Sequence, residues 1–237
     1  MRKSQRMTVI VGDLVSSRRI ENRQLASKTI RSAMARVNRR YAKDLYASLT
    51  LTRGIDELSG VLRRSDAAYR ICRDLNEALA PQAFRFAIVR SDLDVAVKSR
   101  DAAKMDGRAF HRAADMIATA KRMGQHFRFD LDFRYHELNL WITELANLAH
   151  VLRSAWTDHQ RRLVELYAKM ENQEAVAKKL GITQQAVSVG LRQAHWKDIE
   201  RAERLVDRAL ESKGQDKSES LYSQIQTTKL VRTDEVE

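Results

Sequence analysis

The chain has 237 residues, 43% of them hydrophobic, which is enough for one large or two modest domains with a real core. Its formal net charge of +12 favours a polyanionic partner. The single cysteine, Cys72, excludes an intramolecular disulfide framework and fits a reducing cytoplasm, and no apolar run approaches the length of a membrane span. We therefore expect a cytoplasmic protein with no membrane partner.

The first half of the chain alternates between strand and helix patterns. Alternating or β-branched apolar runs predict strands over residues 8–11, 47–52, 58–62, 83–89 and 127–133. Amphipathic patterns predict helices over residues 22–41, 65–79 and 105–123. Ser65 is the expected N-cap of the middle helix, and Pro81 its stop. The order βαββαβ followed by αβ predicts an α+β domain over residues 1–135, with a mixed or antiparallel sheet and helices on one face.

The second half of the chain has helical patterns only. A helix expected over residues 136–156 is apolar around much of its circumference, which predicts a connecting helix buried between two parts of the chain. Thr157 and Gln160 form a capping-box pattern at the start of the next helix, and Asn172 is placed to cap the one after it.

The stretch Gln173–Arg192 has the pattern of a helix-turn-helix. Small and apolar residues stand where two helices must cross closely, at Ala177, Val187 and Leu191. Gly181 suits the tight turn, and Thr183 is the expected N-cap of the second helix. An ordinary helical hairpin with a glycine turn shares part of this pattern, but the agreement of all positions favours binding of double-stranded DNA.

The second of these helices would present polar side chains to base edges, and nearby cations would meet phosphates. The base-reading candidates, with the adjoining cap, are Thr183, Gln184, Gln185, Ser188 and Arg192. The phosphate candidates are Arg161, Arg162, Lys178 and Lys179. Gln can bond adenine and Arg can bond guanine in a bidentate way, so these residue types suit sequence recognition.

An apolar pattern continues this recognition helix to about Ser212. A small domain alone does not bury a stripe of that length, so the stripe would pack on the sheet domain or on a second copy of the chain. Paired half-sites favour the homodimer. We expect an all-α DNA-binding domain over residues 157–212, and a polar, mobile tail over residues 213–237.

Carboxylates stand where the first strand and the next hairpin end. Asp13 closes the first strand, and Asp56 and Glu57 lie at the hairpin turn. Two or three such groups at adjacent strand ends suit Mg²⁺, and Ser17 and Arg18 could meet phosphate oxygens. The same residues equally suit a loop cap and a solvated turn, so spacing alone leaves both interpretations open.

The chain resembles the SatD family in four stretches. These are GDLVSSR at 12–18, DELSG at 56–60, MDGRAFHRA at 105–113, and WTDHQ at 156–160 followed by the helix-turn-helix. The resemblance implies a fold similar to the palm of nucleotide cyclases (a ferredoxin-like palm), in which Asp13 and Asp56 would be the metal acids, with Glu57 beside them. The cofactor it implies is Mg²⁺ with a nucleotide ligand. His111 and Arg112 would contact the nucleotide or fasten their helix to the sheet.

The hairpin departs from the family's usual Gly-Asp-Glu-Phe-Gln-Gly. Ile55 stands for the first glycine, Leu58 for the phenylalanine and Ser59 for the glutamine. A glycine lets the backbone approach a phosphate or base, which isoleucine would block. We interpret these changes as a domain that keeps the fold and has lost turnover.

Three functions compete on this evidence. The first is a DNA-binding regulator whose cyclase-like domain serves dimerisation or ligand sensing. The alternative is a metal-dependent nucleotidyl cyclase, or a related phosphoryl-transfer enzyme, controlled by its DNA-binding domain. The third is a protein that coats DNA without sequence preference.

Overall fold

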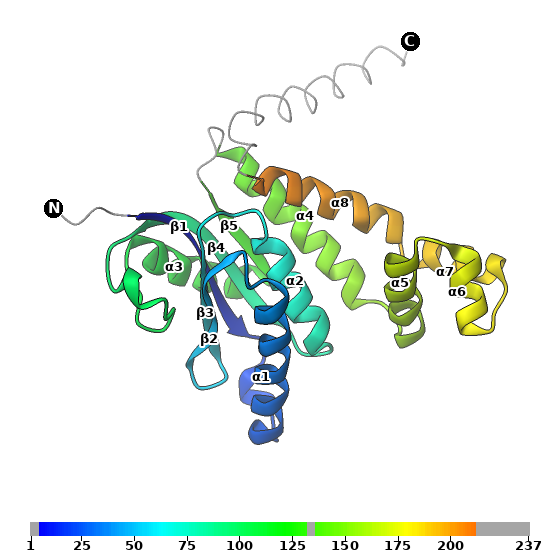
Figure 1. Ribbon diagram of the computed structural model, residues 1–237, viewed down its shortest axis with the longest axis horizontal. Helices are drawn as coiled ribbons and strands as arrows, with labels where there is room; N and C mark the ends of the chain where they lie inside the picture. Colours follow the sequence, from blue (N-terminus) through cyan, green and yellow to red (C-terminus); the bar gives the residue numbers. More distant parts are fainter. Residues whose placement is uncertain (1–4, 132–135, 212–237) are drawn as a thin grey trace, which may run out of the picture. The chain divides into compact units, whose positions relative to one another are not determined.

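The computed structural model describes residues 5–131 and 136–211 (Figure 1). Strands are β1 (Gln5–Leu14), β2 (Leu45–Arg53), β3 (Glu57–Leu62), β4 (Phe84–Leu93) and β5 (Phe127–Asp130). Helices are α1 (Arg23–Arg40), α2 (Ala68–Leu79), α3 (Arg108–Met123), α4 (Glu137–Ser154), α5 (Asp158–Met170), α6 (Gln173–Leu180), α7 (Gln184–Gln193) and α8 (Trp196–Leu210). Short 3-10 helices lie at Ser17–Arg19 and Val97–Ser99. The predicted tail over 213–237 lies outside the described residues.

The chain divides into two compact units. Among described residues, the N-terminal unit contains 5–131, 136–143 and 207–211, and the C-terminal unit contains 144–206. No described helix is both long and apolar enough to cross a membrane.

The sheet of the N-terminal unit is mixed, one of the two arrangements that the sequence predicted. Its strands run β2-β3-β1-β4-β5, with β1 antiparallel to both β3 and β4, and β5 parallel to β4. Because β2 is antiparallel to β3, β1 and β2 are parallel with β3 between them. Likewise β3 and β4 are parallel with β1 between them. Two interleaved split βαβ units therefore build an α+β fold with a mixed five-stranded sheet.

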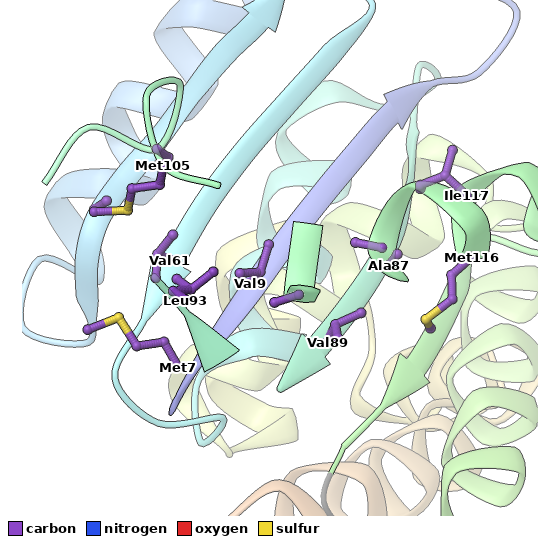
Figure 2. Packing of buried hydrophobic residues seen from close by; sticks show 13 residues of the cluster. Met7, Val9, Val61, Ala87, Val89, Leu93, Met105, Met116 and Ile117 are labelled. Atoms are coloured by element: carbon purple, nitrogen blue, oxygen red, sulfur yellow. The ribbon is translucent and has the colours of Figure 1, made fainter. Parts of the chain in front are cut away.

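Helices cover both faces of this sheet, so the prediction of helices on one face was wrong. Val9 and Val89 pack with Ala113 of α3 (Figure 2). On the opposite face, Tyr69 of α2 meets the Phe127 ring edge-on at a centroid distance of 5.3 Å. Figure 1 shows α1 and α2 together on that second side. Strands β1 and β4 carry near-continuous apolar runs because both of their faces are buried.

Ser65 does not cap α2 as predicted. The helix begins at Ala68 and its N-cap position is Ala67, whose side chain has no polar group. The Ser65 Oγ instead shares a 2.9 Å hydrogen bond with Thr8 Oγ1 in the buried interior. A long-range bond to β1 therefore replaces the local cap.

The MDGR segment forms a joint between β4 and α3. Val95 and Asp106 form an isolated antiparallel bridge, and Asp106 Oδ1 accepts from Gly107 N at 2.7 Å. Gly107 has φ +146°, and a Cβ there would lie 3.0 Å from Asp94 Oδ1 and 3.1 Å from Asp92 O. The glycine is thus required by both its backbone conformation and its close contacts.

Gly107→Ala should destabilise the N-terminal unit. We expect backbone strain of about 1–3 kcal/mol, because φ +146° with ψ −178° is a region that essentially only glycine adopts, and about 1–3 kcal/mol more from the close contacts. Gly124→Ala is the control, because Gly124 also has positive φ but no heavy atom within 4 Å of an added Cβ. Denaturant titration compares the two, and equal losses would show that the contacts around Gly107 yield without cost.

The C-terminal unit corrects two predictions about its helices. Leu148 and Val151 of α4 are 60% and 59% exposed, so this helix is not buried around its circumference. The recognition helix does not continue to Ser212, because α7 ends at Gln193 and His195 adopts a left-handed φ of 51° before α8. Ile199 and Val206 on α8 are fully buried within one chain, which removes the argument that a second copy must cover them.

Candidate nucleic-acid interface and acidic strand ends

Helices α5, α6 and α7 share one core, to which α4 and α8 add Ala149 and Ile199. Leu163, Val176 and Val187 are fully buried there. The α5–α7 crossing depends on Gly190, where a Cβ would come within 2.9 Å of Leu163 Cδ1. The sequence interpretation relied on Ala177, which is 6% exposed, and missed Gly190. This core fixes which side of α7 faces inward.

Local bonds fix how α6 turns into α7. Gly181 has φ 68°, and Ile182 N donates to Ala177 O at 3.1 Å, closing the turn. Thr183 Oγ1 accepts from Ala186 N at 3.1 Å. The predicted caps at Thr183, Asn172 and Thr157 are all confirmed, the last as a full capping box with Gln160.

The opposite side of α7 is a polar, exposed face. Gln184, Gln185, Ser188 and Arg192 are all exposed, as the pattern predicted. The Gln184 Nε2 donates to Gln173 Oε1 of α6, which holds one amide in place at the start of α7. Val189, 39% exposed, lies on the same side and was not predicted. This apolar side chain is suited to contact a thymine methyl group.

Three of the four predicted phosphate cations are free to reach a ligand. Arg162, Lys178 and Lys179 are exposed. Arg161 is different, because its Nη2 donates to Arg153 O at 3.4 Å and its guanidinium lies 5.9 Å from the centroid of the Trp156 ring. Arg161 therefore contributes contacts within the C-terminal unit, and its predicted role at phosphate stays a prediction.

A buried ion pair supports the end of α7. Arg153 donates from Nε and Nη2 to the two carboxylate oxygens of Glu203, both at 2.8 Å. The Arg153 guanidinium also lies 4.8 Å from the centroid of the Trp156 ring, whose Nε1 donates to Ala194 O at 2.8 Å. Trp156 therefore connects the buried ion pair to Ala194, the residue that caps the end of α7.

The N-terminal unit brings the predicted carboxylates to one edge of its sheet. Leu14 N donates to Asp56 O at 2.8 Å, which places the hairpin beside the end of β1. Asp13 and Glu57 are direct partners in the β1–β3 pairing, and Arg85 is the partner of Asp13 on β4. Direct cross-strand partners point to the same face, here the α3 face.

Cations of the chain itself neutralise these carboxylates. Lys121 Nζ lies 2.7 Å from Asp13 Oδ1, and Arg85 Nη1 lies 3.8 Å from Asp13 Oδ2. Arg23 Nη2 contacts both oxygens of Asp56, at 3.1 and 3.2 Å. Glu57 Oε1 lies 3.7 Å from Arg53 Nη1.

A metal centre does not fit this arrangement of charges. Over residues 5–131 and 136–211, no three His, Cys, Asp or Glu side chains lie together so that they could hold a metal ion. Mg²⁺ needs carboxylate oxygens that are free to coordinate it, whereas Asp13 and Asp56 each accept from a guanidinium or ammonium group. The metal role of Asp13, Asp56 and Glu57 therefore stays a prediction without geometric support.

The predicted nucleotide contacts are dispersed. His111 and Arg112 lie near the start of α3, ten and nine residues before Lys121, which is about 15 Å along a helix axis for His111. Arg112 Nε donates to Asp130 Oδ2 of β5, so Arg112 fastens α3 to the sheet. Ser17 offers its carbonyl to Arg23 Nη1 at 3.3 Å, and Arg18 is exposed. His111 and Arg112 therefore lie more than two helical turns from Lys121, the ion-pair partner of Asp13.

His126 should make the N-terminal unit less stable in acid. Burial, and then the positive charge of Arg85, lower the pKa of His126, although a bond to the Phe84 backbone raises it. A histidine in the unfolded chain has a pKa of about 6.5. Below that pH the unfolded chain binds a proton that the folded chain does not, so stability should fall. His126→Gln should flatten the pH dependence of the free energy of unfolding between about pH 5 and 7, and an unchanged slope would contradict this assignment.

Comparisons with solved structures give distant similarities only. A bacterial light-regulated adenylyl cyclase matches 54% of this chain at 13% identity with a TM-score of 0.42, and the chain spans only 43% of that protein's length. A regulator of polyketide synthase expression from Bifidobacterium adolescentis matches 88% of this chain and 87% of its own at 13% identity, with a TM-score of 0.24.

The chain itself matches a family model over most of its length. No curated protein sequence matches it. The model of the SatD family matches residues 7–205, which include all of the described sheet except the first two residues of β1, the acidic strand ends and α5 to α7. The chain therefore belongs to the SatD family.

Proposed function

We propose that this protein is a DNA-binding regulator that reads double-stranded DNA with α7. The observation that carries the proposal is the two-sided character of α7. Its inner side is fixed by Val187 and Leu191 in the core, and its outer side presents Gln185, Ser188 and Arg192 to solvent. A helix held this firmly can place amide and guanidinium groups against base edges with little loss of conformational entropy.

The dimensions of α7 suit the major groove. Its ten residues span about 15 Å, and a major groove about 12 Å wide admits one helix. Arg162, Lys178 and Lys179 would contact phosphates and set the register of the helix. A homodimer remains part of the proposal because such readers commonly use paired half-sites, and palindromic targets would test it.

For the N-terminal unit we propose dimerisation or ligand sensing without turnover, on a cyclase-like palm fold. A two-metal mechanism needs free acids, whereas Asp13 contacts Lys121 and Asp56 contacts Arg23. A nucleotide bound here would meet cations supplied by the chain. The cyclase alternative has no specific feature of the described residues in its favour.

The first test is recovery of fragmented genomic DNA by the purified full-length protein, with and without a nucleoside triphosphate and Mg²⁺. The proposal predicts enrichment of a few sites that share a motif. A change of that set with nucleotide would make the N-terminal unit a sensor. Uniform recovery of all fragments would indicate a coating protein, and no recovery would contradict DNA binding.

A further inference from the structure

The positive charge of the chain is not on the proposed DNA-reading unit. Residues 1–143 contain 28 Lys or Arg against 16 Asp or Glu, and residues 144–237 contain 15 of each; the C-terminal unit itself, residues 144–206, contains 10 Lys or Arg against 8 Asp or Glu. The whole formal net charge of +12 therefore precedes Glu144. Since phosphate contacts supply most of the sequence-independent affinity for DNA, the C-terminal unit is poorly charged for that purpose.

Helix α1 concentrates this charge on one side. Its 18 residues contain six Lys or Arg and no Asp or Glu. The apolar side is buried in the N-terminal unit, through Ala26, Ile30, Ala33, Met34 and Val37. The four cations on the opposite side, here named the α1 basic face, are all exposed: Lys28, Arg31, Arg36 and Arg39.

The α1 basic face is not neutralised by the described part of the chain. Of the six cations of α1, the two at its ends form salt bridges, Arg23 with Asp56 and Arg40 with Asp74. Arg31 and Arg36 donate only to serine hydroxyls one turn earlier, at 3.4 and 3.3 Å. Four cations over about 16 Å of helix thus keep their full charge for an external partner.

We infer that the α1 basic face binds the phosphate backbone of duplex DNA. The choice of duplex DNA as the polyanion rests on the proposed function; the presence of a basic binding face does not. The positive charge of the face is complementary to phosphates, and its length of about 16 Å corresponds to about five phosphates along one strand. A membrane-bound helix would need an exposed apolar side, whereas that of α1 is buried and Leu25 is its one large exposed hydrophobic residue. The N-terminal unit then supplies affinity, and α7 supplies sequence recognition.

The test compares two triple variants of the full chain. One is Arg31→Ala, Arg36→Ala and Arg39→Ala, on the α1 basic face. The matched control is Lys98→Ala, Lys104→Ala and Arg108→Ala, three exposed cations before and at the start of α3 on the other face of the sheet. Affinity for a 30-base-pair duplex of arbitrary sequence is measured across salt concentrations by fluorescence anisotropy, after circular dichroism shows that each variant is folded.

The α1 variant should reduce the slope of log affinity against log salt by about two to three, because each lost phosphate contact removes about 0.9. The control should change it by less than about one. Equal salt slopes for the α1 variant and the control variant would overturn the proposal. A DNA affinity of the α1 variant unchanged from wild type would also overturn it. Loss of binding to phosphatidylserine vesicles with unchanged DNA affinity would assign the face to membranes instead.

A third variant separates this proposal from the reading role of α7. Arg192→Ala should lower the preference for a selected site over random duplex and leave random-duplex affinity within about twofold. The α1 variant should weaken binding to the selected site and to random duplex by the same factor, so that the ratio of the two affinities stays as in wild type. If wild type shows no preferred site, the reading role fails, yet loss of random-duplex affinity in the α1 variant would still support the α1 basic face.

Discussion

Glu203→Ala should lower the free energy of unfolding of the C-terminal unit by about 3–5 kcal/mol, the largest stability effect that we expect. The side chains of Arg153 and Glu203 are only 11% and 5% exposed, and two 2.8 Å hydrogen bonds join them. Removing the carboxylate takes the Glu203 charge and two hydrogen bonds away from the Arg153 guanidinium, which is buried against Trp156. Most of the lost stability therefore comes from the desolvated Arg153 charge that remains in the variant, and less of it from the attraction between the two side chains.

Urea titration followed by tryptophan fluorescence measures this effect, since Trp156 contacts the guanidinium. Glu200→Ala is the matched control, because its 3.4 Å contact with Arg204 is solvent-exposed and should contribute less than about 1 kcal/mol. Replacing both partners, Arg153→Met with Glu203→Leu, should recover much of the loss. Similar small losses for Glu203→Ala and Glu200→Ala would contradict a buried ion pair as the support of α7.

Arg192→Ala should weaken binding to a selected DNA site by about 5- to 150-fold, which corresponds to about 1–3 kcal/mol for one bidentate base contact. Arg192 is exposed near the end of α7, on the side opposite to Val187. The loss should concentrate on one base-pair position, where substitution of the base should no longer matter to the variant. Competition binding with single-base variants of the site measures this.

Lys169→Ala serves as the control for Arg192→Ala, because Lys169 is an exposed cation at the end of α5, outside the α7 face. It should leave the base preference intact. An equal loss for Arg192→Ala on every sequence would show that Arg192 meets phosphate only, and Val189 and Gln185 would then carry recognition.

Features that depend on neighbouring residues were predictable from the sequence. Thr157, Asn172 and Thr183 each accept from a backbone N–H within the next turn, so a cap needs only a few residues of context. The αL turn at Gly181 is equally local. The exposed side of α7 followed because Val187 and Leu191 fixed its buried side.

Features that depend on distant residues were not predictable in the same way. Ser65 has the composition of a cap, but the buried hydroxyl of Thr8 competes for it across 57 residues. The carboxylates at the strand ends look free in sequence, whereas Lys121 and Arg23 reach them from two helices. The α3 face of the sheet was missed because doubly buried strands lose the alternation that marks a single covered face.

The break between α7 and α8 shows the limit of apolar periodicity. The stripe through Trp196, Ile199 and Val206 continues the period of α7 closely enough to suggest one helix. His195 in the left-handed region interrupts it, and Trp156 Nε1 bonds the Ala194 carbonyl instead. The left-handed His195 and the tertiary contact of Trp156 with Ala194 together mark where the recognition helix ends.

The most direct test of DNA reading by α7 is site-specific crosslinking from Ser188→Cys. Cys72 is the single native cysteine, and its complete burial raises the pKa of its thiol, so labelling with a photo-crosslinker should be selective. Ala118→Cys, an exposed position on α3, is the control. Crosslinks from position 188 to defined bases of a selected duplex, absent from position 118, are the predicted result. Crosslinks from position 118 with none from position 188 would contradict the proposal.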